Sequence, residues 1–273
     1  MLETSSSSNA GARLSPRAAL NYRLDEQSVI RTAYSRAYRM PSLLESNTRF
    51  TIFDPAGDVL DIVTQPDPDI GPEQIRTWEI GYYRAFSTVR GHLDLRIFHE
   101  YIDDAIDTYR IPVADMDGRV SLRSNNSTWE NSGAEVQLRL QPLSRFWFVL
   151  NYAYINTTDY CQDEGPADGG LECRKAPPTP LHTASALLNL SLPAHWDLSL
   201  AQYYVDEVRW GEGGHRDAYD RTDVRLAREW KLLGGQRLSG ALVMQNALGN
   251  KYAEFYKYNE FDQRTYLQLK LEF

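Results

Sequence analysis

Apolar and polar residues alternate strictly along many short segments of this chain. Residues 266–273 read YLQLKLEF and residues 134–141 read AEVQLRLQ, with an apolar side chain at every second position. Successive side chains of a β-strand point to opposite faces of its sheet, so this alternation predicts strands with one apolar face and one polar or charged face. A tilted strand of about 9–11 such residues is long enough to cross a lipid bilayer.

The alternation recurs in eleven segments, which we expect to be strands: residues 13–23, 27–38, 74–86, 90–112, 126–141, 145–158, 180–193, 196–210, 218–231, 236–249 and 262–273. The connections are alternately short (24–26, 87–89, 142–144, 194–195, 232–235) and long (39–73, 113–125, 159–179, 211–217, 250–261). Outer-membrane barrels have short periplasmic turns and longer extracellular loops, whereas a soluble β-sandwich does not need that asymmetry. We therefore predict an all-β chain that forms an antiparallel transmembrane β-barrel.

Aromatic side chains fall mainly towards the ends of these segments, where a barrel places its interfacial girdles. They are Trp78, Tyr82, Phe146, Phe148, Tyr152, Tyr154, Trp196, Tyr204, Trp230 and Phe273. Taken alone, the same residues could equally pack the core of a sandwich. Together with the alternating connection lengths, they favour the barrel.

Composition argues against several other classes of protein. The chain has 273 residues and a formal net charge of −8, and it lacks the clustered Lys and Arg that contact phosphates, so we expect no nucleic-acid partner. No run of 18 apolar residues occurs, which excludes a transmembrane helix. Residues 1–12 are serine-rich and lack the basic and apolar regions of a secretory signal, and we expect them to be disordered. The expected barrel domain is residues 13–273.

The two cysteines, Cys161 and Cys173, lie in one long connection rich in Asp, Gly and Pro. A pair of cysteines on one exposed loop favours a disulfide and an oxidising compartment. The alternative is two free thiols in a flexible cytosolic loop. Metal binding is disfavoured because only His182 lies nearby.

No pattern in the sequence indicates catalysis, a cofactor or a metal. The five histidines show no metal-ligand spacing, and there is no nucleophile elbow, phosphate loop or dinucleotide fingerprint. Adjacent carboxylates such as Asp103 and Asp104 fall at the margins of connections, where we expect them to be solvated. Acidic residues of the 39–73 connection could coordinate a cation but lack calcium-loop spacing: they are Asp54, Asp58, Asp61, Asp67 and Asp69. We expect no enzyme.

Four stretches, in this order, resemble TonB-dependent receptors. Residues 31–45 (RTAYSRAYRMPSLLE) are similar to the family's aromatic–Ser–Arg–aromatic strand with its following Arg and Pro. Residues 72–82 (PEQIRTWEIGY) resemble the strand that comes next, and residues 131–140 (NSGAEVQLRL) resemble a descending Asn-to-Glu strand, although Ala134 stands where Gly is common. Residues 243–255 (VMQNALGNKYAEF) resemble the penultimate strand, and the chain stops on an aromatic residue.

The resemblance implies a barrel of about 22 strands whose lumen is closed by an N-terminal plug. This chain would be its C-terminal half, with no plug domain and no TonB box, and would be inactive alone. Such receptors import an iron–siderophore, haem or cobalamin across the cell outer membrane, and all three ligand classes stay open. The implied partners are outer-membrane lipid, the barrel-assembly machinery, the ligand and, only through the missing plug, TonB.

The resemblance also implies roles for single residues. Charged residues on the polar faces of the strands would face the plug and the ligand route: Arg31, Glu79, Arg96, Glu100, Glu135, Arg139, Arg225 and Lys270. The barrel-assembly machinery would read a C-terminal signal in Leu269, Leu271 and Phe273. A hypothesis from another class is a soluble all-β module for carbohydrate, with Tyr252, Phe255 and Tyr256 as its contact surface.

Overall fold

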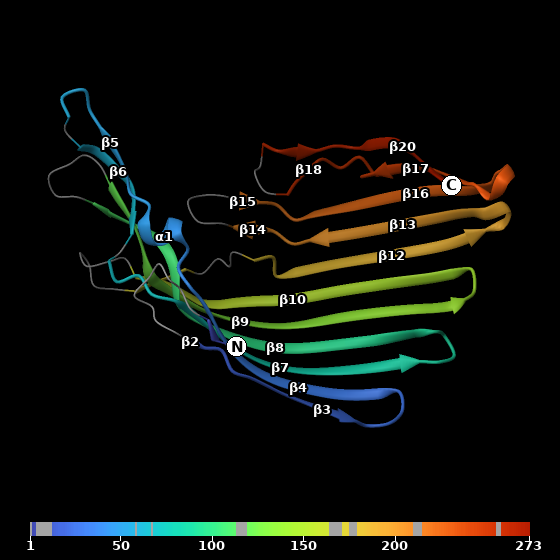
Figure 1. Ribbon diagram of the computed structural model, residues 1–273, viewed down its shortest axis with the longest axis horizontal. Coiled ribbons are helices and arrows are strands. Elements are labelled where there is room, and N and C mark those ends of the chain that lie inside the picture. Colours follow the sequence, from blue (N-terminus) through green and yellow to red (C-terminus); the bar gives the residue numbers. More distant parts are fainter. Residues whose placement is uncertain are drawn as a thin grey trace.

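The chain folds into a curved, antiparallel meander of strands (Figure 1). The computed structural model describes residues 2–3, 13–57, 59–66, 68–112, 119–163, 171–174, 179–209, 215–254 and 258–273. The main sheet has 14 strands, of which β5, β6 and β11 lie off the main path, which leaves eleven. No helix in the described ranges is long and apolar enough to cross a membrane.

The eleven strands of the main path follow one another in sequence order, as predicted. They are β3 (Arg17–Arg23), β4 (Ser28–Arg39), β7 (Glu73–Phe86), β8 (Gly91–Pro112), β9 (Arg119–Leu143), β10 (Phe146–Asp163), β12 (His182–Leu192), β13 (Trp196–Val205), β16 (Tyr219–Lys231), β17 (Arg237–Gln245) and β20 (Arg264–Glu272). Each pairs antiparallel with the next. Among the described strands, β3 pairs only with β4 and β20 only with β17, so the sheet is open at both edges and the barrel is not closed.

The connections alternate in length along the whole path. Tight turns join β3 to β4, β7 to β8, β9 to β10, β12 to β13 and β16 to β17, and they gather at the right-hand end in Figure 1. We call this the tight-turn end and the opposite one the long-connection end. Left-handed residues make the turns possible, including Ala194 and His195 (both φ 59) and Gly234 and Gly235 (φ 84 and 85).

The 39–73 segment, expected to be an irregular loop, contains structure of its own. The helix α1 (Leu43–Asn47) begins at a capping box, in which Ser42 and Glu45 each bond the other's backbone N–H. The hairpin of β5 (Phe50–Phe53) and β6 (Val59–Pro66) follows, and β6 pairs in parallel with β9. β9 begins at Arg119 rather than at 126, because its first residues pair with the end of β8, where Arg119 lies opposite Pro112, as well as with β6.

Several short elements complete the chain. They are β1 (Leu2–Glu3) with β2 (Arg13–Leu14), β11 (Leu171–Arg174) with β10, β14 (Val208–Arg209) with β15 (His215–Arg216), β18 (Tyr252–Ala253) with β19 (Glu260–Phe261), and the 3-10 turns η1 (Pro193–His195) and η2 (Leu233–Gly235). The expectation of disorder over residues 1–12 falls mostly outside the described residues, although Leu2 and Glu3 are paired. The strand expected over 236–249 ends at Gln245, because Asn246 adopts a left-handed conformation (φ 51).

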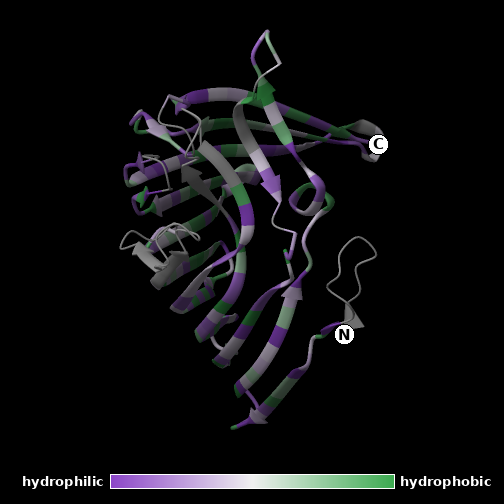
Figure 2. Ribbon diagram, turned by 90° about the vertical axis from the view of Figure 1, so that its left-hand side faces the viewer, coloured by the Kyte–Doolittle hydropathy of each residue, from purple (hydrophilic) through white to green (hydrophobic). Residues whose placement is uncertain are grey.

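The two faces of the sheet differ in polarity, and hydrophilic and hydrophobic residues alternate along the strands in Figure 2. We call the face that carries Arg96 the inner face and the other the outer face. A row of leucines crosses β13, β16, β17 and β20 on the outer face: Leu198, Leu226, Leu242 and Leu267 are 37%, 36%, 49% and 67% exposed. So much exposed apolar surface in register requires an apolar environment.

Candidate functional site on the inner face

The candidate site starts with an ion pair that spans three strands. Arg31 on β4 reaches past β7 to Asp94 on β8, and its Nη2 lies 2.5 Å from Asp94 Oδ1. Gly81 on β7 is the residue directly opposite Arg31. A Cβ at Gly81 would come within 2.4 Å of Arg31 Nε, so the missing side chain is what lets the guanidinium cross.

Arg96 on β8 lies between two carboxylates from the neighbouring strands. Its Nε donates to Glu79 Oε2 at 3.0 Å and its Nη1 donates to Glu135 Oε2 at 3.1 Å. Glu79 also lies 4.0 Å from Arg17 Nη2 on β3, so each carboxylate of this cluster has an arginine partner. The Arg96, Glu79 and Glu135 side chains are 31%, 25% and 42% exposed, so the pairs contribute little to stability and serve mainly to hold charges in place.

A chain of neutral hydrogen bonds continues the same face across the next strands. Gln137 Nε2 donates to Asn151 Oδ1 at 3.0 Å, and Asn151 Nδ2 donates to Ser185 Oγ at 3.1 Å. Tyr203 on β13 lies opposite Ser185 and continues the row. Around this row, charged groups lie on β4 to β9 and the neutral hydrogen-bonding groups lie on β9 to β13.

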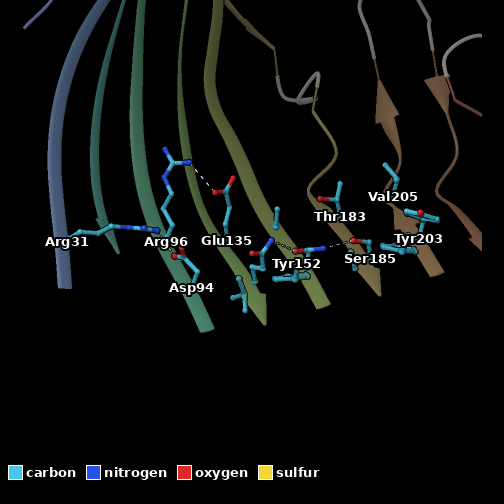
Figure 3. A pocket seen from close by; sticks show the side chains of 15 residues that line it. Arg31, Asp94, Arg96, Glu135, Tyr152, Thr183, Ser185, Tyr203 and Val205 are labelled. Carbon is cyan, nitrogen blue, oxygen red and sulfur yellow. Dashed lines mark hydrogen bonds and ion pairs between the residues drawn. The ribbon is translucent and has the colours of Figure 1, made fainter. Parts of the chain in front are cut away.

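These side chains line a hollow of about 540 Å³ on the inner face (Figure 3). Its size falls within the range of about 300–1,000 Å³ for small-molecule sites. The lining offers guanidinium, carboxylate, amide and hydroxyl groups, which can bind a polar molecule or the backbone of another polypeptide by hydrogen bonds. Within the described residues no three His, Cys, Asp or Glu side chains cluster as a metal site would require.

The eight charged residues singled out in the sequence all lie on the inner face by register. Arg31, Arg96 and Glu135 line the hollow, and Glu79 bonds Arg96. The other four lie elsewhere on the same face: Glu100 accepts from Asn131 at 3.3 Å, the Arg139 guanidinium lies 5.7 Å from the Trp147 ring centroid, Arg225 lies opposite Ser199, and Lys270 pairs with Glu272. The structure therefore gathers half of them at or beside one hollow.

Sequence reasoning did not select Asp94, Asn151, Ser185 or Tyr203 as site residues. Asp94 is a charged residue at a polar position of its alternating segment, so the sequence could have identified it as a candidate. Asn151, Ser185 and Tyr203 are neutral, and an uncharged residue at a polar strand position carries no mark that separates a site from ordinary solvent exposure. Only the register of three strands brings them together.

A second cluster fixes the long-connection end of β16 and β17. Arg221 Nη2 lies 2.6 Å from Asp223 Oδ2, and Asp223 Oδ1 accepts the Asn246 N–H at 2.9 Å. Asn246 is 2% exposed and turns the chain out of the sheet. This cluster is the physical reason for the end of β17.

Tyr252 packs inside a stack of aromatic rings rather than at the surface. Its ring centroid lies 4.7 Å from that of Tyr219 and 5.4 Å from that of Phe261, and the residue is 7% exposed. Burial raises the pKa of the Tyr252 phenol. Tyr252 is thus wrongly placed for the carbohydrate-contact surface of the alternative hypothesis, and its expected companions Phe255 and Tyr256 lie outside the described residues.

Arg39 ties α1 to the end of the sheet. Its Nε lies 2.5 Å from Glu73 Oε2 and its Nη1 lies 2.9 Å from Glu45 Oε1. The hydrogen bonds with Glu73 raise the pKa of Arg39 further above its usual value. Burial acts to raise the pKa of Glu45, but the hydrogen bonds from Ser42 and Arg39 outweigh it, so this pKa lies below its usual value.

The apolar residues of the C-terminal strand are exposed. Leu269 and Leu271 lie on the outer face of β20, 66% and 45% exposed, and Phe273 follows the strand with 94% exposed.

The backbone register places Cys161 on β10 directly opposite Cys173 on β11. Directly opposed residues of an antiparallel pair have Cα atoms about 4.5–5.5 Å apart, which is within the range that a disulfide spans.

Comparison with known proteins identifies the family. The model of the TonB-dependent receptor-like β-barrel matches residues 3–246. The chain belongs to this family. A search of the curated proteins found no match.

Solved receptors share the fold of this TonB-dependent receptor barrel. A variant of the ferric enterobactin receptor PfeA from Pseudomonas aeruginosa superposes with a TM-score of 0.67 at 12% identity, covering 94% of this chain and 40% of that one. The siderophore receptor PirA from Acinetobacter baumannii gives 0.68 at 13% identity, covering 96% and 41%. The ferric-catecholate import receptor Fiu from E. coli K12 gives 0.67 at 16% identity, covering 95% and 34%. The chain thus spans well under half the length of these receptors.

Proposed function

We propose that this chain is the C-terminal half of the barrel of an outer-membrane receptor that imports an iron–siderophore chelate, with energy delivered through TonB. The observation that carries the proposal is the eleven-strand meander with exposed leucine rows on one face and a charged network on the other. Lipid would cover the outer face, because only a closed barrel with an apolar exterior satisfies every backbone group in hydrocarbon.

The alternating connections orient the chain in the membrane. We place the tight-turn end in the periplasm and the long-connection end outside the cell, following the rule for outer-membrane barrels. The barrel-assembly machinery would engage β20 through Leu269, Leu271 and Phe273. TonB would act through the plug of the complete receptor.

Among the three ligand classes implied by the sequence, an iron–siderophore has the most support. The solved receptors with this fold are named for ferric enterobactin, siderophore and ferric catecholate. At identities of 12–16% these names carry the fold and not the ligand, so the choice among siderophores rests on measurement.

The inner-face network has a specific role in the proposal. Arg31, Arg96, Glu79 and Glu135 would hold the plug in the lumen and line the route that opens when it moves. Partly exposed paired charges suit this task, because each can exchange its partner within the wall for one on the plug.

Uptake of radiolabelled ligands tests the proposal. The complete receptor that contains this chain would be expressed in cells deleted for their own ferric-siderophore receptors and offered ferric catecholate, ferric hydroxamate, haem and cobalamin separately. We expect uptake of a ferric siderophore that disappears in a tonB deletion. Uptake of haem or cobalamin alone would refute the ligand class, and no uptake by a folded, surface-exposed barrel would refute transport.

A further inference from the structure

We infer that Arg228, on the outer face of β16, binds the phosphate of a phospholipid headgroup in the periplasmic leaflet of the outer membrane. The inference rests on the proposed placement of the sheet in the membrane and is independent of the transported ligand. It assigns a lipid site to one residue whose neighbours on the outer face are apolar.

Two tryptophans flank the Arg228 guanidinium. Its Cζ lies 5.3 Å from the ring centroid of Trp196, which is directly opposite on β13, and 5.3 Å from that of Trp230 on its own strand. Gly240 is the opposite residue on β17, and a Cβ there would come within 3.0 Å of the Trp230 ring. The glycine therefore leaves room for Trp230 to lie beside the arginine, and the two rings hold the guanidinium in a fixed position.

Within the described part of the chain, Arg228 has no carboxylate partner, and its buried Nε has no hydrogen-bond acceptor. The adjacent outer-face side chains are apolar: Leu198 and Leu226 on one side and Leu269 beyond Gly240. The charged neighbours on its own strand, Arg225 and Glu229, belong to the inner face. A cation among apolar groups facing hydrocarbon is costly unless an anion accompanies it.

The position of Arg228 along β16 indicates which anion accompanies it. Arg228 lies three residues before the end of β16 at Lys231, which is about 10 Å at the rise of a strand, near the tight-turn end. An arginine stem can lie along apolar surface while its guanidinium extends towards the headgroups. Tryptophan favours the same interface, and the planar guanidinium matches the oxygens of a phosphate. A phospholipid phosphate is the anion present at that depth.

Native mass spectrometry of the complete receptor tests the inference by counting retained lipids. The protein would be purified in mild detergent and equilibrated with phosphatidylglycerol, with diacylglycerol or with inorganic phosphate. We expect retained phosphatidylglycerol to fall about tenfold or more in Arg228→Gln, since a charge-assisted phosphate contact is lost. Arg225→Gln removes the same charge from the inner face of the same strand and should retain lipid like the parent.

Three results would overturn the inference. They are equal phosphatidylglycerol retention by the parent and Arg228→Gln, equal retention of diacylglycerol by the parent, and displacement of the lipid by inorganic phosphate, which would assign the site to a soluble anion.

A second variant guards against misfolding. Arg228→Leu makes the outer face continuously apolar and should fold as well as the parent, by heat-modified mobility in gels, while losing the lipid. Retention by Arg228→Leu would also contradict the inference. Lipid retention is measured without the transported ligand. A failure of siderophore uptake would therefore refute the proposed function without affecting the test of the lipid site.

Discussion

At the scale of single residues, the inner-face network depends on one missing side chain. We expect Gly81→Ala to displace Arg31 and break its pair with Asp94, because the new Cβ would lie 2.4 Å from Arg31 Nε and 3.1 Å from the Leu95 carbonyl oxygen. Overpacking of this kind costs about 1–3 kcal/mol. Urea unfolding of the complete receptor in vesicles measures it.

A double-mutant cycle separates this clash from a general effect of alanine. In an Arg31→Ala background the same Gly81→Ala change should cost much less, because only the contact with the Leu95 carbonyl remains. Additive effects would show that Arg31 does not lie over Gly81.

The two facing cysteines lead to a second prediction about single residues. We expect Cys161 and Cys173 to form a disulfide, since they are opposed in register and lie at the end of the sheet that we place outside the cell. The closed loop spans 13 residues, for which the chain-entropy description gives about 3 kcal/mol of stabilisation. Peptide mapping without reductant tests the bond, and alkylation of both thiols in the membrane-inserted receptor would contradict it.

The lowered pKa of Glu45 makes the anchoring of α1 sensitive to pH. A carboxyl whose folded pKa lies below its unfolded value stabilises the folded loop fully above pH 4.5, and this contribution is lost as the pH falls through the folded pKa. We expect amide exchange of α1 to accelerate in acid. Glu45→Gln should show fast exchange at both pH values, and an acid response unchanged by that substitution would contradict the assignment.

At the scale of whole elements, the two faces of each strand make opposite predictions for neighbouring positions. Arg in place of Leu138 should cost about 2–4 kcal/mol if the outer face meets the middle of the bilayer. Arg in place of Gln137 should be tolerated, because that side chain lies on the polar inner face beside Asn151. Leu269 and Gln268 form a matched pair on β20.

Folding yields in lipid vesicles measure the contrast. Equal effects at Leu138 and Gln137 would remove the two-faced assignment, since only the strand register separates the two positions.

The alternation predicted which segments form strands, but it predicted the ends of the strands less accurately. The strand predicted over 236–249 ends earlier, at Gln245, because Asp223, on another strand, accepts a hydrogen bond from the Asn246 N–H. The start of β9 at Arg119 depends on β8, whose Pro112 lies opposite Arg119, and β6 also pairs with this part of β9 from a segment expected to be loop. Both ends depend on partners in other strands.

At the scale of the whole molecule, the open edges lead to a prediction about the isolated chain. The described sheet leaves β3 and β20 with one partner each. Unpaired backbone groups cost several kcal/mol each in hydrocarbon, so a sheet with two open edges does not insert as a monomer. We expect the chain expressed alone to aggregate or be degraded and to support no uptake, while the complete receptor does.

Ligand uptake by cells that carry only this chain, in a strain deleted for the matching receptor, would refute this expectation. A soluble, monodisperse monomer recovered without detergent would contradict the membrane assignment itself.

The sequence by itself determined the strand class, the number of strands on the main path and their two-faced character, because each depends on a local period of two and on the lengths of connections. The family followed from the resemblance of four sequence stretches to TonB-dependent receptors. The tertiary structure decided which polar residues meet. Arg31 reaches Asp94 across Gly81, and Arg228 lies between Trp196 and Trp230, only because register places residues far apart in sequence side by side. Register is a property of strand pairs, and no single segment carries it.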